Sequence, residues 1–104
     1  MASVCIFPRH FQGQEQAVAE IIKEGYRPVS WTDEPNASYE PHRHEDDETL
    51  YILAGSMDFT DLETGKTHHL EPGDKLFLPA NTLHSANTRE GTTYIMGIRI
   101  LDAT

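Results

Sequence analysis

The sequence has a single cysteine, Cys5, among its 104 residues. One cysteine cannot close an intramolecular disulfide, and it excludes a metal site built on several thiolates. The N-terminal residues, MASVCIFPRHFQ, contain neither the basic segment nor the apolar run of a secretory signal peptide. These absences favour a cytoplasmic protein.

Basic residues are also scarce. Lys and Arg number 8 against 17 Asp and Glu, which gives a net charge of −9. The eight are scattered, whereas nucleic acids and anionic membranes are bound through clusters of basic side chains. No run approaches the roughly 20 apolar residues of a membrane-spanning helix. We therefore expect a small molecule, a metal ion or another protein as partner, and neither nucleic acid nor membrane.

The composition is that of an ordinary globular chain, with 38% hydrophobic and 24% charged residues. A chain of this length buries roughly 65% of the surface that its unfolded form exposes, which is enough for one core. We expect a single domain over residues 1–104, with a strand and helix segment at 1–26 and a β-barrel core at 27–104.

Local patterning predicts one helix and many short strands. Apolar residues recur on one side of Gln14–Glu24, and Gly25 is positioned to end a helix there. Short apolar or alternating runs separated by turn residues predict the strands Arg27–Thr32, His42–Asp46, Thr49–Ala54, Met57–Leu62, Lys66–Leu70, Lys75–Leu78, Leu83–Asn87 and Thr92–Leu101, with Val4–Phe7 as a further edge strand. This pattern predicts an all-β fold, a jelly-roll barrel with one short N-terminal helix.

The most informative segment is PHRHEDDE at residues 41–48. Side chains alternate between the two faces of a strand, so His42, His44 and Glu48 can point to one side. A fourth ligand has to come from another strand, and His84 lies in one. Three imidazoles and a carboxylate suit divalent Fe, Mn, Ni, Co, Zn or Cu, and suit Ca or Mg poorly. For two such histidines alone, a solvated acidic face is the competing interpretation.

Two spaced motifs resemble those of the cupin family. The pattern HxHx₃Ex₆G starts at His42 and is similar to the first cupin motif, and Gx₅PxNx₂H starts at Gly73 and is similar to most of the second. The resemblance spans residues 36–87. It implies a jelly-roll barrel that binds one divalent metal through His42, His44, Glu48 and His84.

Three positions depart from the family pattern. Asn36 and Asn81 stand where cupins carry glycine, and asparagine tolerates positive φ better than most residues. We therefore predict positive φ at both. The asparagine that closes the second motif is replaced by Thr88, with Asn87 one residue early and on the opposite strand face.

Other side chains have simpler predicted roles. Arg43 has the opposite parity to the histidines and is expected at the surface, paired with nearby acids. Arg99 lies in an apolar run, so we expect it to have a partner: an internal carboxylate, solvent at an edge, or an anionic substrate. His10 and the His68–His69 pair are expected at the surface. The residues proposed for the walls of an apolar pocket are Trp31, Leu50, Ile52, Phe59, Phe77 and Met96.

Strand Thr49–Ala54 also bears on assembly. It has Leu50 and Ile52 on the inward face and Tyr51 and Leu53 on the outward face. A strand that is apolar on both faces needs cover on both. The predicted helix covers only part of the outside, so we expect a homodimer.

Two functions fit these residues. The resemblance implies a metal-dependent enzyme, with dioxygenase, oxidase, decarboxylase or isomerase chemistry on a small oxygenated molecule, in which Glu48 stays on the metal or acts as a base. The alternative is a non-catalytic module that binds a metal and a small molecule. A purely structural metal ranks last, because structural sites tend to be closed and to use cysteine.

Overall fold

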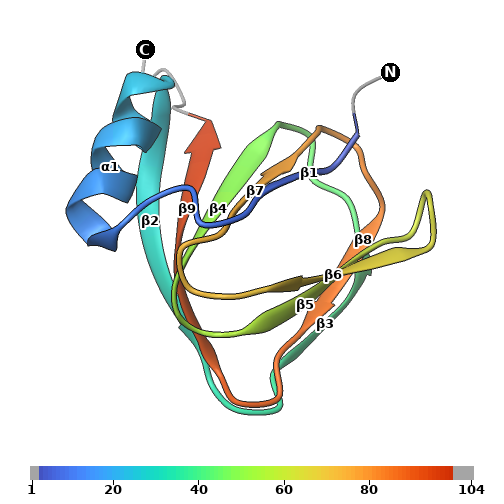
Figure 1. The fold of residues 1–104 in the computed structure, drawn as a ribbon. Coiled ribbons are helices and arrows are strands. Elements are labelled where there is room, and N and C mark those ends of the chain that lie inside the picture. Colours follow the sequence, from blue (N-terminus) through green and yellow to red (C-terminus); the bar gives the residue numbers. More distant parts are fainter. Residues whose placement is uncertain (1–2, 100–104) are drawn as a thin grey trace.

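The structure, a computed structural model, describes residues 3–99 and consists of two antiparallel sheets that face each other (Figure 1). Within these residues lie one helix, α1 (Gly13–Lys23), and the strands β1 (Cys5–Phe7), β2 (Tyr26–Asp33), β3 (Ser38–His42), β4 (Glu48–Gly55), β5 (Met57–Asp61), β6 (Lys66–Leu70), β7 (Lys75–Leu78), β8 (His84–Asn87) and β9 (Thr92–Arg99). The sheet orders are β1-β7-β4-β9-β2 and β3-β8-β5-β6. This is the predicted all-β jelly-roll barrel with one N-terminal helix.

Most elements begin and end within two residues of their predicted bounds, and the edge strand predicted at Val4–Phe7 is β1. The exception is the strand predicted over His42–Asp46, which is wrong. Strand β3 already ends at His42, and residues 43–47 form the connection that carries the chain from the four-stranded sheet to the five-stranded one. The predicted end of the last strand, at Leu101, lies outside the described residues.

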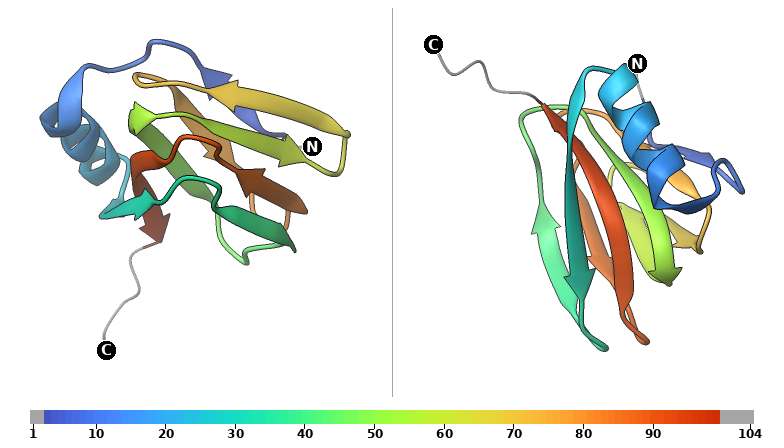
Figure 2. Two further views of the ribbon diagram at one scale, coloured as in Figure 1. Left: turned by 90° about the horizontal axis from the view of Figure 1, so that it is seen from below. Right: turned by 90° about the vertical axis from the view of Figure 1, so that its left-hand side faces the viewer.

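The interior between the sheets is built from side chains of alternate strand positions. Its buried members are Leu50, Ile52, Met57, Phe59, Leu70, Leu76, Leu78 and Tyr94. A second apolar cluster lies on the outer face of the five-stranded sheet, under α1, and contains Phe11, Ala17, Ile21, Tyr51 and Ile95. Figure 2 shows α1 lying along this outer face.

Tyr51 points outward as predicted, but the chain itself covers it. Its side chain is fully buried and meets Phe11 edge to face, with ring centroids 5.2 Å apart. The outward face of β4 therefore does not by itself require a second subunit. The homodimer stays a prediction, to be checked by light scattering at micromolar concentration.

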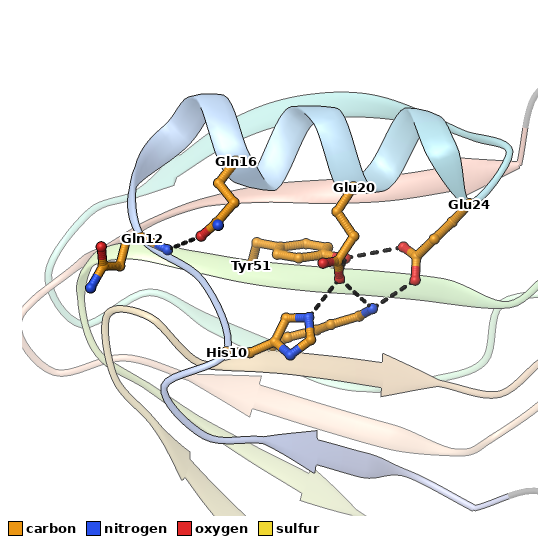
Figure 3. Close-up of polar contacts among 7 residues, drawn as sticks. His10, Gln12, Gln16, Glu20, Glu24 and Tyr51 are labelled. Carbon is orange, nitrogen blue, oxygen red and sulfur yellow. Dashed lines mark hydrogen bonds and ion pairs between the residues drawn. The ribbon is translucent and has the colours of Figure 1, made fainter.

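A charged network fastens α1 to the sheet (Figure 3). The Lys75 ammonium, on a side chain only 8% exposed, lies 2.8 Å from Glu20 and 2.7 Å from Glu24. The Tyr51 hydroxyl donates to the same two carboxylates at 2.6 and 3.0 Å, and His10 Nε2 lies 2.7 Å from Glu20. Burial alone would raise the pKa of Glu20, but the hydrogen bonds from Lys75, Tyr51 and His10 outweigh it and bring the pKa to about 2.

The two asparagines at turns have the predicted backbone conformation. The φ angle is 70° at Asn36 and 62° at Asn81. Thr88, which departs from the second motif, is buried and closes a turn: its hydroxyl donates to the Ser56 carbonyl at 2.7 Å and accepts from the Gly91 N–H at 2.9 Å. The substitution for asparagine thus serves the backbone after β8 rather than the histidine.

Candidate metal centre and ligand cavity

Three histidines converge inside the barrel. His42 ends β3 and lies opposite His84, the first residue of β8, in the register of the two strands. His44 follows in the connection to β4. One ring nitrogen from each residue lies within 4.8 Å of the others, close enough that the three could hold one metal ion after small side-chain adjustments.

The connection after β3 is held in place by the turn between β7 and β8. The Asn81 N–H donates to the His44 carbonyl at 2.8 Å, and the Ala80 N–H donates to the Asp47 carboxylate at 2.7 Å. Because His44 lies outside a strand, its direction is set by these bonds and not by strand alternation.

Two of the imidazoles have a fixed tautomer. His42 Nδ1 lies 2.6 Å from the Glu40 carbonyl, and His84 Nδ1 lies 2.9 Å from the Thr82 carbonyl. A carbonyl only accepts, so the proton is on Nδ1 and Nε2 is left with its lone pair. Metal-binding histidines characteristically donate their second nitrogen in this way. The donor set present here therefore fits a divalent transition metal.

Glu48, the first residue of β4, stands slightly apart. It does not belong to the group of three converging nitrogens, but its carboxylate lies 3.5 Å from His44 Nδ1 and lines the same cavity. Burial raises the pKa of Glu48, and the nearby Asp46 carboxylate adds to this effect while His42 opposes it. A carboxyl group in this setting exchanges a proton more readily near neutral pH than an exposed one does.

Burial also lowers the pKa of both His44 and His84, and the neighbouring imidazoles add to the effect, while the hydrogen bond to the Thr82 carbonyl opposes it at His84 without reversing it. Neutral imidazole is the form that binds a metal ion. The environment of the site thus favours the protonation state that a metal requires.

The histidines open onto a cavity of about 340 Å³ between the sheets. Four of the proposed wall residues line it: Trp31, Leu50, Phe59 and Met96. The proposal was wrong for Phe77, which alternates with the interior residues Leu76 and Leu78 and so lies on the outer face of β7. It was also wrong for Ile52, which packs in the core without reaching the cavity.

Further lining residues were missed by the sequence reasoning: Tyr39, Met57, Leu78, Ala86, Tyr94 and Ile98. Strand parity could have found four of them. Met57 lies two residues before Phe59 on β5. Ala86 lies two residues after His84, and Tyr94 and Ile98 flank Met96 at two residues on each side.

Arg43 and Arg99, the two arginines given a predicted role above, lie outside the cavity. Arg43 is exposed and lies 3.4 Å from Glu63, as predicted. Arg99 is exposed at the end of β9 and donates to Asp46 at 2.9 Å, so its partner is a carboxylate at the surface and no anionic substrate is needed to balance it. Of the other histidines, His10 contacts Glu20 and His69 contacts Asp58 at 2.7 Å.

Comparison with known proteins identifies the family of the chain. Residues 29–97 match the family model of the cupin domain. The chain belongs to the cupin family. None of the curated proteins matches this cupin, and nothing helical in residues 3–99 is long and apolar enough to cross a membrane.

Several solved structures resemble it at low sequence identity. A DUF861 family protein from Thermotoga maritima is 23% identical, with a TM-score of 0.67 over 92% of this chain and 99% of the other. The DMSP lyase DddQ from Ruegeria pomeroyi is 26% identical, with a TM-score of 0.64 over 74% of this chain and 39% of that longer one. The polyketide cyclase RemF from Streptomyces resistomycificus is 24% identical, with a TM-score of 0.62 over 75% of this chain and 63% of the other.

Proposed function

We propose that this cupin holds one divalent transition metal through His42, His44, Glu48 and His84, and that it is an enzyme acting on a small oxygenated molecule in the adjoining cavity. The observation that carries the proposal is the convergence of three ring nitrogens within 4.8 Å at the wall of a largely apolar cavity. Fe, Mn, Ni, Co, Zn and Cu all suit this donor set.

A bound ion supplies Lewis acidity, an exchangeable coordination position and, for a redox-active metal, dioxygen chemistry. The chain's own contribution is twofold: the carbonyls of Glu40 and Thr82 orient the imidazoles of His42 and His84, and burial lowers the pKa of His44 and His84 and so favours their neutral form. Glu48 is the group proposed to hold or move a proton, since its carboxylate lines the cavity and its pKa is raised.

The reaction classes that fit are those of a dioxygenase or oxidase, a decarboxylase or an isomerase. Each acts on an oxygenated or enolisable molecule that a metal can polarise. Two of the similar structures are named as a lyase and a cyclase, which supports the view that a fold of this kind can carry catalysis.

A second function is favoured by one observation. The three-nitrogen group is complete without Glu48, whose carboxylate faces His44 instead. A non-catalytic module that binds metal and a small molecule needs no carboxylate positioned for proton transfer.

Elemental analysis of protein purified without a chelating tag, read together with an oxygen-uptake screen, tests the proposal. Iron, nickel, copper or manganese with turnover supports an enzyme, and zinc without turnover supports the binding module. His84→Ala should lower metal affinity about 10-fold or more, while His69→Ala, exposed and outside the cavity, should leave it unchanged. Full metal occupancy in His84→Ala would contradict the ligand set.

A further inference from the structure

The cavity has a second distinctive region, built on aromatic rings and placed away from the histidines. Tyr39 precedes His42 by three residues on β3, roughly 10 Å along a strand. On β9, Tyr94 is paired with Trp31 of β2 on one side and with Ile52 of β4 on the other. Glu48 lies near the opposite end of β9, beyond the pair of Thr49 with Gly97, and is therefore separated from Tyr94 along the strand. We call Trp31, Tyr39 and Tyr94 the aromatic wall.

The buried carboxylate of Asp33 holds the aromatic wall together. Its Oδ1 accepts from Trp31 Nε1 at 2.9 Å and from the Tyr39 hydroxyl in a short hydrogen bond, and its Oδ2 accepts from the Tyr94 hydroxyl at 3.0 Å. These contacts tie β2, the edge of one sheet, to β3, the edge of the other. Asp33 is 6% exposed and therefore acts as a positioning residue behind the rings.

The rings that Asp33 positions line the cavity and are not covered by other side chains over their full surface. Trp31 is 50% exposed and Tyr39 is 38% exposed, although their polar atoms are bonded to Asp33. No aromatic pair that includes either ring is found among residues 3–99. Two rings fixed in place and without a stacking partner are suited to a flat ligand.

The charges of the lining restrict the ligand further. The lining contains no Lys or Arg, and its one carboxylate, Glu48, lies beside the histidines. Asp33 does not reach the cavity, and its oxygens are already satisfied by three donors. Away from the histidines, an anion would find no counter-charge and would lie near the Asp33 carboxylate, while a cation would find no carboxylate in the lining and only the faces of the aromatic rings to offset its loss of water.

We infer that the cavity takes an uncharged molecule with a flat aromatic ring, which lies against Trp31 and Tyr39 while its oxygen substituents face the histidines. This rests on the proposed metal site for the oxygen end only. The ring end rests on the Asp33 network and on the absence of charge in the lining.

The test uses four probes that share two vicinal hydroxyl oxygens: 4-methylcatechol, 3,4-dihydroxybenzoate, dopamine and 4-methylcyclohexane-1,2-diol. They present respectively a neutral ring, an anion, a cation and a saturated ring to the far end of the cavity. Binding to the zinc-loaded protein is measured by calorimetry, since zinc does not oxidise catechols. We expect 4-methylcatechol to bind about 10-fold or more tightly than either charged probe, and several-fold more tightly than the saturated diol.

Variants then locate the selectivity. Trp31→Leu should reduce the preference for the aromatic over the saturated probe to the part that the phenolic oxygens on zinc supply, and Trp31→Phe should retain it in full, at unchanged zinc occupancy. Phe77→Leu is the matched control, because that ring lies on the outer face of β7. The probe series on the unaltered chain tests the inference even if a variant fails to fold.

The outcomes separate the inference from the proposed function. Tighter binding of a charged probe, equal binding of all four, or no binding to zinc-loaded protein overturns the inference and leaves the metal site intact. If the chain takes up no zinc, the proposed function fails. The inference about the ring end is then upheld if metal-free protein still prefers 4-methylcatechol over both charged probes, and overturned if it does not.

Discussion

The imidazole of His84 lies flat against the ring of Phe59, with the ring centroids 5.1 Å apart and the ring planes inclined by 11°. Phe59 is 2% exposed and comes from β5, the strand paired with β8. His84 is thus held by a stacked ring on one side, by the Thr82 carbonyl at Nδ1 and by its close neighbour His42. The apolar core orients a residue of the proposed metal site directly.

This stacking predicts an effect of the core on metal binding. Phe59→Leu should lower metal affinity by about 10-fold, because outer-shell support of a ligand is worth that much or more. Phe11→Leu, a buried ring under α1, should cost similar unfolding free energy but leave metal affinity unchanged. Isothermal titration and urea unfolding on both variants check this, and equal metal affinities in the two would contradict it.

The left-handed backbone at Asn81 predicts a stability order. With φ at 62°, Asn81→Gly should be nearly neutral, whereas Asn81→Val should destabilise by about 1–2 kcal/mol, because a β-branched side chain resists this region. Urea midpoints of the two variants give the comparison. Equal stability of the glycine and valine variants would show that the turn relaxes to negative φ.

Replacing two glycines that have similar φ angles should lower the free energy of unfolding by very different amounts. Gly55 and Gly65 have φ of 73° and 79°, but a Cβ at Gly55 would lie 1.9 Å from the Gly91 carbonyl oxygen, while one at Gly65 would meet nothing within 4 Å. Gly65→Ala should cost about 1–2 kcal/mol from φ alone, and Gly55→Ala about 3 kcal/mol or more because backbone must move. Thermal and urea unfolding distinguish the two, and similar losses would contradict the close approach.

The network under α1 predicts a pH dependence of stability. The pKa of Glu20 is about 2 in the folded protein against an ordinary 4.5, so its contribution is complete above pH 4.5 and is lost as the pH falls toward 2. Glu20→Gln should therefore be less stable than the parent at pH 7, by about 1–2 kcal/mol after allowance for solvent screening. The difference in unfolding free energy between the two proteins should disappear as the pH falls toward 2. Glu34→Gln, an exposed acid in a turn, is the control, and a gap that stays constant from pH 7 to 3 would contradict the assignment.

Much of the fold follows from strand alternation and turn chemistry. The pattern located β4 and β9 and the inward direction of Leu50 and Met96, because each strand is covered on at least one face. The pattern failed at residues 43–47. There, hydrogen bonds donated by the backbone N–H groups of Ala80 and Asn81, in the turn between β7 and β8, fix the path of the chain. Such contacts between distant segments leave no local signal.

The residues of the site were also predictable in part. The spacing singled out the three histidines that converge, but it assumed one strand face, whereas His44 lies in a connection. Of the aromatic wall, Trp31 was predicted and Tyr94 could have been found by strand parity, but their connection through Asp33 was not predictable, because Asp33 accepts from donors that lie 2, 6 and 61 residues away. No periodicity relates those positions.

Glu48→Gln separates catalysis from binding. The change keeps the shape of the side chain, removes one negative charge and leaves all three imidazoles as donors. If Glu48 moves a proton during turnover, the variant should lose turnover by about 10²–10⁴-fold when compared at matched metal occupancy. A binding module should instead lose ligand affinity only in step with metal occupancy.

The measurement is a metal titration that follows turnover or ligand binding in both proteins. Glu45→Gln, an exposed neighbour in the same connection, controls for the loss of one negative charge near the site. Because the Glu48 carboxylate lies 3.5 Å from His44 Nδ1, the variant should also need more metal to reach full loading. If the two proteins turn over alike once both are fully loaded, a catalytic carboxylate is excluded and any activity depends on the metal and its histidines alone.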